Sequence, residues 1–192
     1  MILLLDHQDS FTHNLEHLLA QFDEVLVIDR KDAPIDKIKS CKILVFSPGP
    51  GSPEDYPESI EILSHFTNRK PMIGICLGFQ MMLFAEGANV VRQKQVLHGV
   101  ETEIEVNTRS RTYKECPPTI KVARYHSLQV DNQSLLSLPT STKITSTDPI
   151  RQVPLSFEDN KRKLFGLQYH PESFLTINGN HIMQNIIHAC LD

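Results

Sequence analysis

Short apolar runs alternate with segments of helical periodicity in the first half of the chain. The runs are Ile2–Leu5, Val25–Ile28, Ile43–Phe46 and Met72–Ile75. Each is short, apolar and rich in branched side chains, which predicts buried strands. Polar and turn-forming residues separate them.

Helices are expected between these strands. Ser10 is a plausible helix cap, and helices are also expected over Ser59–Phe66 and Leu77–Glu86. After Ser10, apolar residues recur at helical spacing: Phe11, Leu15, Leu18, Leu19 and Phe22. This rhythm predicts an α/β fold, with a mostly parallel, doubly wound sheet and helices on both faces.

The second half has a different pattern. Val100–Val106 alternates apolar and polar residues, as a half-solvated strand does. More strands are expected at Thr119–Arg124, Lys143–Ser146, Val153–Phe157 and Leu164–Tyr169. They predict antiparallel additions at one edge of the sheet, and Ile182–Cys190 predicts a closing amphipathic helix. No repeat or linker divides the chain, so residues 1–192 are interpreted as a single domain.

Composition narrows the class of protein. The formal net charge is −4 and the charges are interspersed, which argues against a nucleic-acid partner. No apolar stretch is long enough to cross a bilayer, which argues against a membrane partner. The four cysteines are Cys41, Cys76, Cys116 and Cys190. Their wide spacing gives no zinc or disulfide framework, so a cytoplasmic protein with reduced thiols is expected.

Cys76 stands at the junction between an expected strand and an expected helix. Gly74 and Gly78 flank it in a G-x-C-x-G arrangement. This is a cysteine form of the nucleophile elbow, in which a strained turn lifts the nucleophile above the sheet edge. The helix N-terminus beneath the sulfur favours the reactive thiolate. Taken alone, the motif leaves an alternative, because buried cysteines usually pack as small hydrophobes.

His170 and Glu172 are candidates for the base that a nucleophilic cysteine needs and for the carboxylate that orients this base. Pro171 favours an extended backbone at His170, and residues two apart in an extended segment point to the same side. The imidazole would accept the thiol proton and the carboxylate would orient the imidazole. His-Pro-Glu alone could also be a surface turn.

Six blocks in order make the chain resemble the class I, triad-type glutamine amidotransferases. Within them it is similar to the small subunits of anthranilate synthase and aminodeoxychorismate synthase. The blocks are Asp9–Leu15, Ser47–Pro53, Gly74–Gln80, His98–Gly99, Arg124–Leu128 and Gln168–Thr176. The resemblance covers nearly the whole chain. It implies a flavodoxin-like fold and hydrolysis of L-glutamine to glutamate and ammonia through a cysteinyl thioester.

The resemblance also implies roles for individual residues. Cys76, His170 and Glu172 would form the catalytic triad. The backbone N–H groups of Gly51 and Leu77 would form the oxyanion hole. Substrate-binding positions would be Gly49, Pro50, Gly51, Gln80, Ser127 and Leu128. From the residues alone, the Gly-Pro-Gly segment could equally be a tight connection, and Gln80 an ordinary helix residue one turn past Cys76.

The implied partner is a larger, chorismate-binding synthase subunit that receives the ammonia. That partner would carry Mg²⁺, and no metal or organic cofactor is expected in this chain. The partner subunit is also expected to activate the glutaminase when it binds this chain. The first interpretation is anthranilate synthase component II, and the alternatives are aminodeoxychorismate synthase component II or a subunit shared by both. More remote alternatives are a γ-glutamyl hydrolase and a non-catalytic regulatory subunit.

Some residues depart from the pattern or have no assigned chemistry. Phe79 stands where relatives often carry His, outside the triad. His126, His98, His13 and His17 are interpreted as structural or interface residues. The spacing of His13 and His17 suits a metal on a helix, but without a third ligand a solvated face is the better interpretation.

Overall fold

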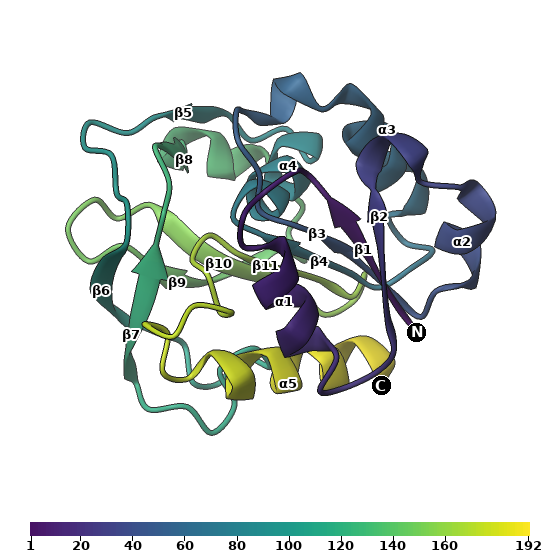
Figure 1. Cartoon of the computed structure of the whole chain (residues 1–192). Helices are drawn as coiled ribbons and strands as arrows, with labels where there is room; N and C mark the ends of the chain where they lie inside the picture. The colour runs from purple at the N-terminus through teal and green to yellow at the C-terminus, as the bar shows by residue number, and fades with distance from the viewer.

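A mixed seven-stranded sheet forms the centre of the molecule (Figure 1). The computed structural model describes all residues, 1–192. The strand order is β2-β1-β3-β4-β11-β10-β9. The parallel strands are β1 (Ile2–Asp6), β2 (Val25–Asp29), β3 (Ile43–Phe46), β4 (Met72–Ile75) and β11 (Leu164–Leu167). β10 (Pro154–Asp159) runs antiparallel to β11 and to β9 (Lys143–Thr147). The expected mostly parallel sheet with an antiparallel edge is confirmed.

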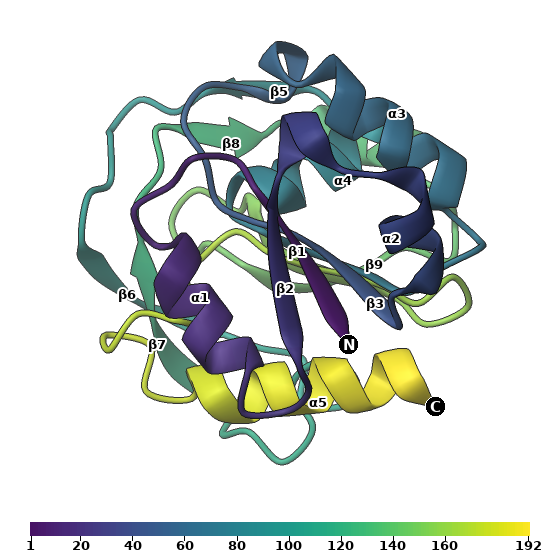
Figure 2. The same ribbon diagram turned by 45° about the vertical axis from the view of Figure 1, so that its right-hand side comes forward.

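Side-chain alternation in β1 explains the layers on the two faces. Ile2 and Leu4 point into one core, and Leu3 and Leu5 point into the other. The first core lies under α1 (Thr12–Leu19) and α5 (Gly179–Leu191). The second lies under α2 (Ile35–Ser40), α3 (Pro57–Phe66) and α4 (Leu77–Ala85). Figure 2 shows these two groups of helices on either side of the sheet.

Two small antiparallel ribbons stand apart from the main sheet. β6 (Val100–Glu105) pairs with β7 (Thr119–Arg124), and β5 (Val90–Arg92) pairs with β8 (Leu128–Val130). The sequence places β6 and β7 at the sheet edge, but only an isolated bridge from Val106 to Ser146 joins them to it. β6 pairs with β7 along its whole length, and its buried Ile104 and exposed glutamates suit a two-stranded ribbon with one face in water.

Several element boundaries differ from the expectation. Ser10 does not cap α1: the helix begins at Thr12, and the Asp9 carboxylate accepts the Phe11 N–H at 2.8 Å. α3 begins at Pro57, two residues earlier than expected, with proline in the first helical turn. The unpredicted elements are α2, β5, β8 and the 3₁₀ turns η1 (Arg30–Asp32), η2 (Pro53–Asp55) and η3 (Asn132–Ser137). All are too short for periodicity to show them.

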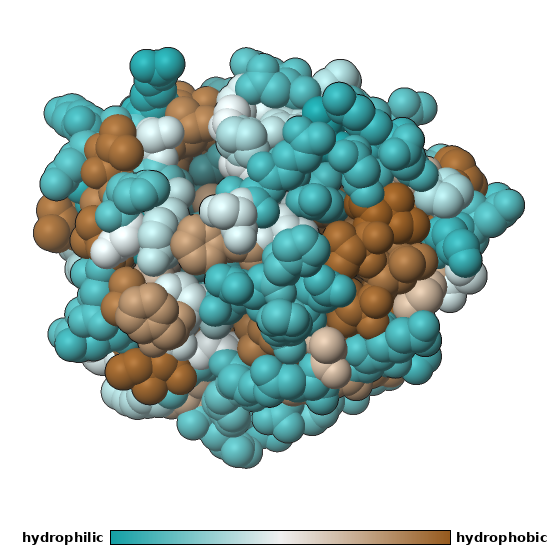
Figure 3. Space-filling model, in the orientation of Figure 1, coloured by the Kyte–Doolittle hydropathy of each residue, from teal (hydrophilic) through white to brown (hydrophobic).

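Polar side chains cover most of the face shown in Figure 3. Hydrophobic residues, brown in Figure 3, cluster on the surface near edge strand β2, whose five residues are all half-buried. His13 and His17 lie on the exposed face of α1, as expected. All four cysteines are buried and unpaired. None of the helices has the length and apolar character that crossing a bilayer requires.

A very close approach of α4 to the sheet positions the turn after β4. A Cβ atom on Gly78 would lie 2.3 Å from the Phe46 carbonyl oxygen. A Cβ atom on Gly74 would lie 2.5 Å from the Gly78 carbonyl group. Both neighbours are backbone atoms, which cannot rotate away. The two glycines of the G-x-C-x-G segment therefore allow the strand and helix to touch at the turn that carries Cys76.

We expect Gly78→Ala to lower the free energy of unfolding by about 3 kcal/mol, because the new methyl group overlaps backbone atoms. Gly87→Ala is the comparison. Gly87 has a φ of +96°, but the nearest atom to its Cβ would be Ser137 Oγ at 3.5 Å. That change should cost only about 1 kcal/mol. Urea unfolding of both variants tests the argument, and equal losses would contradict it.

Candidate active site

The carboxyl ends of β1, β3, β4 and β11 meet at one edge of the sheet, where ligand sites of such folds gather. A cavity of about 480 Å³ lies there. Cys76 lines it together with every residue that the sequence assigns to the oxyanion hole or to substrate: Gly49, Pro50, Gly51, Leu77, Gln80, Ser127 and Leu128. These residues, from three separate segments of the chain, thus line one cavity.

Cys76 occupies the strained turn that its flanking glycines predict. Its backbone angles, φ of 53° and ψ of −100°, are unfavourable for any residue other than glycine. The Cys76 N–H donates to the Leu167 carbonyl oxygen at 2.8 Å, which fixes the turn to β11. The residue directly precedes α4, so the positive end of that helix lies at the sulfur.

His170 and Glu172 face one another as the sequence predicts. His170 Nδ1 and Glu172 Oε1 are 2.7 Å apart, and the His170 N–H donates to the Ala123 carbonyl oxygen at 3.0 Å. The carboxylate holds the proton on Nδ1, which leaves Nε2 free for the thiol. Nε2 has no hydrogen-bond partner within the protein.

The charge state of His170 follows from its neighbours. Burial by itself lowers the pKa of His170, but the Cys76 thiolate and the Glu172 carboxylate together outweigh burial. They hold the pKa well above its usual value of 6.5. The raised pKa favours the protonated imidazole beside Cys76.

Aromatic rings shield the imidazole from water. The ring centroids of Phe11 and Tyr125 lie 5.0 and 5.1 Å from that of His170. His170 is only 1% exposed and does not itself line the cavity. The sequence places Phe11 in a helical stripe and in the Asp9–Leu15 block, and Tyr125 in the Arg124–Leu128 block, but assigns neither ring a role. Together with the surrounding protein, the two rings keep His170 Nε2 out of contact with water.

Gly51 and Leu77, whose N–H groups are the expected oxyanion-hole donors, both line the cavity. Gly51 has a φ of +76°, and the Pro50 carbonyl oxygen before it accepts the Tyr56 hydroxyl at 2.6 Å. After it, the Ser52 N–H donates to Asp55 Oδ2 at 2.8 Å. Leu77 is the first residue of α4, so its N–H has no acceptor within the helix. The Gly51 N–H likewise donates no backbone hydrogen bond.

Two glutamines link the cavity wall to the nucleophile. Gln80 Nε2 donates to the Leu128 carbonyl oxygen at 3.3 Å and to Gln168 Oε1 at 2.9 Å. Gln168 Nε2 in turn contacts Cys76 Sγ at 3.8 Å. Sequence reasoning missed Gln168, although its position two residues before His170 in an extended segment was a usable signal. Gln80 Oε1 makes no hydrogen bond within the protein.

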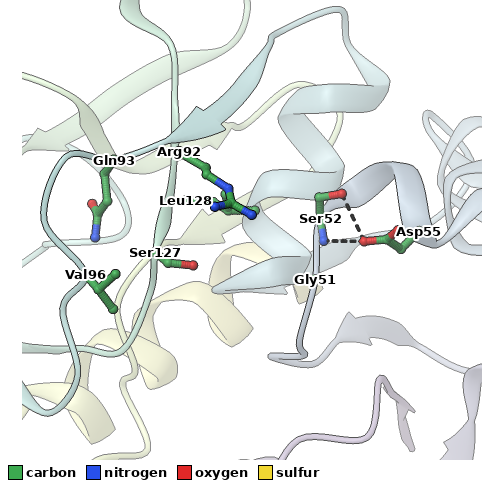
Figure 4. A pocket seen from close by; sticks show the side chains of 8 residues that line it. All are labelled: Gly51, Ser52, Asp55, Arg92, Gln93, Val96, Ser127 and Leu128. Carbon is green, nitrogen blue, oxygen red and sulfur yellow. Dashed lines mark hydrogen bonds between the residues drawn. The ribbon is translucent and has the colours of Figure 1, made fainter.

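A second cavity, of about 490 Å³, adjoins the first (Figure 4). The two share Gly51, Ser127 and Leu128. In Figure 4 the Arg92 side chain extends toward Ser52 and Asp55. A mostly polar space therefore lies beside the cavity that contains Cys76.

Phe79, His98 and His126 lie in different environments: Phe79 is in the core, and the two histidines are at the cavity. Phe79 is fully buried on the face away from the cavity, with its ring centroid 5.8 Å from that of Phe157. The departure at this position thus affects core packing, not the cavity wall. His98 and His126 line the cavity. No group of three or more His, Cys, Asp or Glu side chains is arranged to hold a metal ion.

His7, which sequence reasoning missed, supports the Pro-Gly loop. Its Nδ1 lies 3.1 Å from Ser47 Oγ and its Nε2 lies 3.1 Å from Ser59 Oγ. Ser47 Oγ donates to the Pro48 carbonyl oxygen at 2.7 Å, so it must accept the Nδ1 proton. A neutral ring with its proton on Nδ1 accepts the Ser59 hydroxyl at Nε2. Burial, with a smaller contribution from Arg30, lowers the pKa of His7 to about 4.

We expect acid to weaken the fold through His7. The unfolded residue has a pKa near 6.5 and the folded one near 4, so the unfolded state binds more protons between these values. Stability is complete above pH 6.5 and falls below it, by about 2 kcal/mol at pH 5. Urea unfolding at pH 7.5 and pH 5 should show a smaller difference in His7→Asn. An unchanged difference would contradict the assignment, and His17→Asn, at an exposed position, is the control.

Comparisons with known proteins agree with this geometry. The family model Glutamine amidotransferase class-I matches residues 3–190. Aminodeoxychorismate synthase component 2 of Escherichia coli is 35% identical, with 98% of this chain and 100% of the relative covered. Aminodeoxychorismate/anthranilate synthase component 2 of Bacillus subtilis is 36% identical, with 97% and 95% covered. A solved glutamine amidotransferase from Thermotoga maritima shares the fold, with a TM-score of 0.74, 17% identity, and 100% and 97% covered. The chain belongs to the class I glutamine amidotransferases.

Proposed function

We propose that Cys76 hydrolyses L-glutamine and that the ammonia passes to a chorismate-using partner subunit. The observation that carries the glutaminase assignment is the arrangement around Cys76. Its sulfur sits at a strained helix N-terminus, beside an imidazole that Glu172 orients at 2.7 Å. Gln80 and the Ser127–Leu128 backbone line the same cavity, where they would hold the amino-acid end of glutamine.

The first half of the reaction forms a thioester. The Cys76 thiolate attacks the side-chain carbonyl carbon, and the carbonyl electrons move onto oxygen. The N–H groups of Gly51 and Leu77 stabilise this oxyanion, and loss of one such donor typically costs about 100- to 1000-fold in rate. His170 then gives its Nε2 proton to the departing nitrogen. The C–N bond breaks and ammonia leaves.

The second half regenerates the enzyme. Neutral His170 takes a proton from water, and the resulting hydroxide attacks the thioester carbon. The C–S bond breaks, which releases glutamate and restores the thiolate–imidazolium pair. Glu172 keeps the ring orientation through both halves. We propose that neither a metal nor an organic cofactor takes part in this subunit, and that Mg²⁺ serves the partner.

The names of the relatives support the partner assignment. Both curated relatives are second components of chorismate-linked synthases, and this chain matches them over almost their whole length. We propose anthranilate synthase component II as the first assignment. Aminodeoxychorismate synthase component II is the second, favoured by the E. coli relative, and the B. subtilis relative carries both names. A cytoplasmic location is proposed with it, since four unpaired cysteines suit a reducing compartment.

Product identification tests the assignment. The purified chain, mixed with each candidate large subunit, chorismate, Mg²⁺ and L-glutamine, should release ammonia and form anthranilate or aminodeoxychorismate. Cys76→Ser should abolish glutamine-dependent product, while free ammonia still supports it. Glutaminase turnover should be lower without the large subunit.

Other outcomes would identify the rivals. Partner-independent cleavage of γ-glutamyl peptides would favour a γ-glutamyl hydrolase. Failure of a glutamine-analogue electrophile to label Cys76, even with the partner bound, would favour a non-catalytic subunit.

Glu172→Gln should lower kcat by about 100-fold or more, because general acid–base catalysis contributes on that scale. The amide also removes an anion that raises the pKa of His170, so the alkaline limb of the pH–rate profile should move to lower pH. Glu158→Gln is the matched control. Glu158 is also buried and accepts Thr112 Oγ1 at 2.9 Å, but lines neither cavity. The proposed role is wrong if both variants keep the wild-type profile.

A further inference from the structure

A buried chain of polar groups ends at the substrate-facing segment Ser127–Leu128. Arg124 and Asp148 are both fully buried and form an ion pair. Arg124 Nε also donates to His126 Nε2 at 3.0 Å. His126 Nδ1 lies 2.7 Å from the Leu128 carbonyl oxygen. The chain runs from the end of β9 to the wall of the catalytic cavity.

The direction of each hydrogen bond is fixed. An arginine side chain only donates, so His126 Nε2 must accept from Arg124. The ring proton therefore lies on Nδ1 and is donated to the Leu128 carbonyl oxygen. His126 must stay neutral to do this, and burial followed by the Arg124 charge lowers its pKa to about 3.

Asp148 anchors the far end of the chain. Besides the Arg124 pair, its carboxylate accepts the N–H groups of Ile150 and Arg151 at 2.9 and 2.7 Å, and Arg151 Nη1 at 3.1 Å. A carboxylate with this many donors is fixed in one orientation. It therefore fixes the guanidinium group of Arg124 as well.

The Leu128 carbonyl oxygen is where this chain meets the catalytic groups. It accepts from His126 and from Gln80, and Gln80 connects through Gln168 to Cys76 Sγ. Gln93 holds the same segment from outside: its N–H donates to the Ser127 carbonyl oxygen at 2.9 Å. The backbone that faces substrate is thus fixed by a buried polar chain and not by packing alone.

We infer that Asp148, Arg124 and His126 are positioning residues that hold the Ser127–Leu128 backbone and the Gln80 amide in place for the amino-acid end of glutamine. This inference rests on the proposed glutaminase function. It assigns to His126 a role in substrate affinity. The contacts it controls are made equally in the ground state and the transition state, so its loss should appear in KM more than in kcat.

Two substitutions at His126 separate the two hydrogen bonds. His126→Gln places an oxygen near the Nε2 position, which keeps an acceptor for Arg124 and removes the donor to Leu128. His126→Asn places an amide N–H near the Nδ1 position, which keeps the donor and removes the acceptor. In the complex with the synthase subunit, His126→Gln should raise KM for L-glutamine by about tenfold, the effect of one lost hydrogen bond of about 1.4 kcal/mol. His126→Asn should keep KM within about threefold of wild type and lower Tm.

A matched pair of aspartates controls for general destabilisation. Asp148→Asn should raise KM for L-glutamine. Asp159→Asn alters another fully buried aspartate, paired with Arg162 at 2.7 Å in the β10–β11 hairpin, where neither cavity lies. It should lower Tm and leave KM unchanged.

The outcomes separate the two proposals. A wild-type complex without Cys76-dependent glutamine turnover would overturn the proposed function, and with it the role of His126. An active wild type whose KM is unchanged in His126→Gln and Asp148→Asn, or raised as much in Asp159→Asn, would overturn the positioning role alone.

Discussion

The contact between α4 and the end of β3 is the constraint on which the active edge depends. Gly78 lies against the Phe46 carbonyl group so closely that no side chain fits between them. This approach forces the connection from β4 into a single strained residue, Cys76. The strain, on the order of 1–3 kcal/mol, persists because the sheet and helix on either side are buried. The same contact brings the Leu77 N–H, which has no acceptor in α4, to the cavity beside Cys76. One close packing contact therefore positions both residues.

Around that turn, buried polar residues hold the backbone segments that line the cavity. A buried ion pair such as Arg124–Asp148 adds little to stability, because desolvation offsets most of the attraction. The ion pair instead fixes geometry. It holds the Arg124 guanidinium group, which fixes the His126 ring, and the ring in turn holds the Leu128 carbonyl oxygen. The His7–Ser47–Ser59 set acts likewise on the loop that carries Gly51. Apolar packing alone would leave these loop backbones free to rotate.

The parts of this site that the sequence predicts are those whose geometry is local. Cys76 with its two glycines, and His170 with Glu172, each lie within a few residues, so turn strain and strand alternation suffice to place them. His7 with Ser59, Gln80 with Gln168, and Arg124 with Asp148 are separated by 24 to 88 residues. Their pairing depends on how the strands are ordered, which periodicity does not reveal. For the same reason periodicity does not predict the β5–β8 pair and places β6 and β7 at the sheet edge instead of in a separate ribbon. The expected cap at Ser10 is wrong because the Asp9 carboxylate already accepts the Phe11 N–H at that turn.

Three buried histidines show how the surroundings decide the chemistry. His7 and His126 are almost fully buried and each has an arginine nearby, so burial and the neighbouring charge both favour the neutral ring. A neutral ring has one donor and one acceptor, and each of these two rings uses both to fix a loop. His170 is equally buried, but the groups that face it are the Glu172 carboxylate and the Cys76 side chain. Their charges outweigh burial and keep the ring protonated, which is the state needed to release ammonia. The identity of the adjacent charge, more than the depth of burial, separates the proton carrier from the two structural rings.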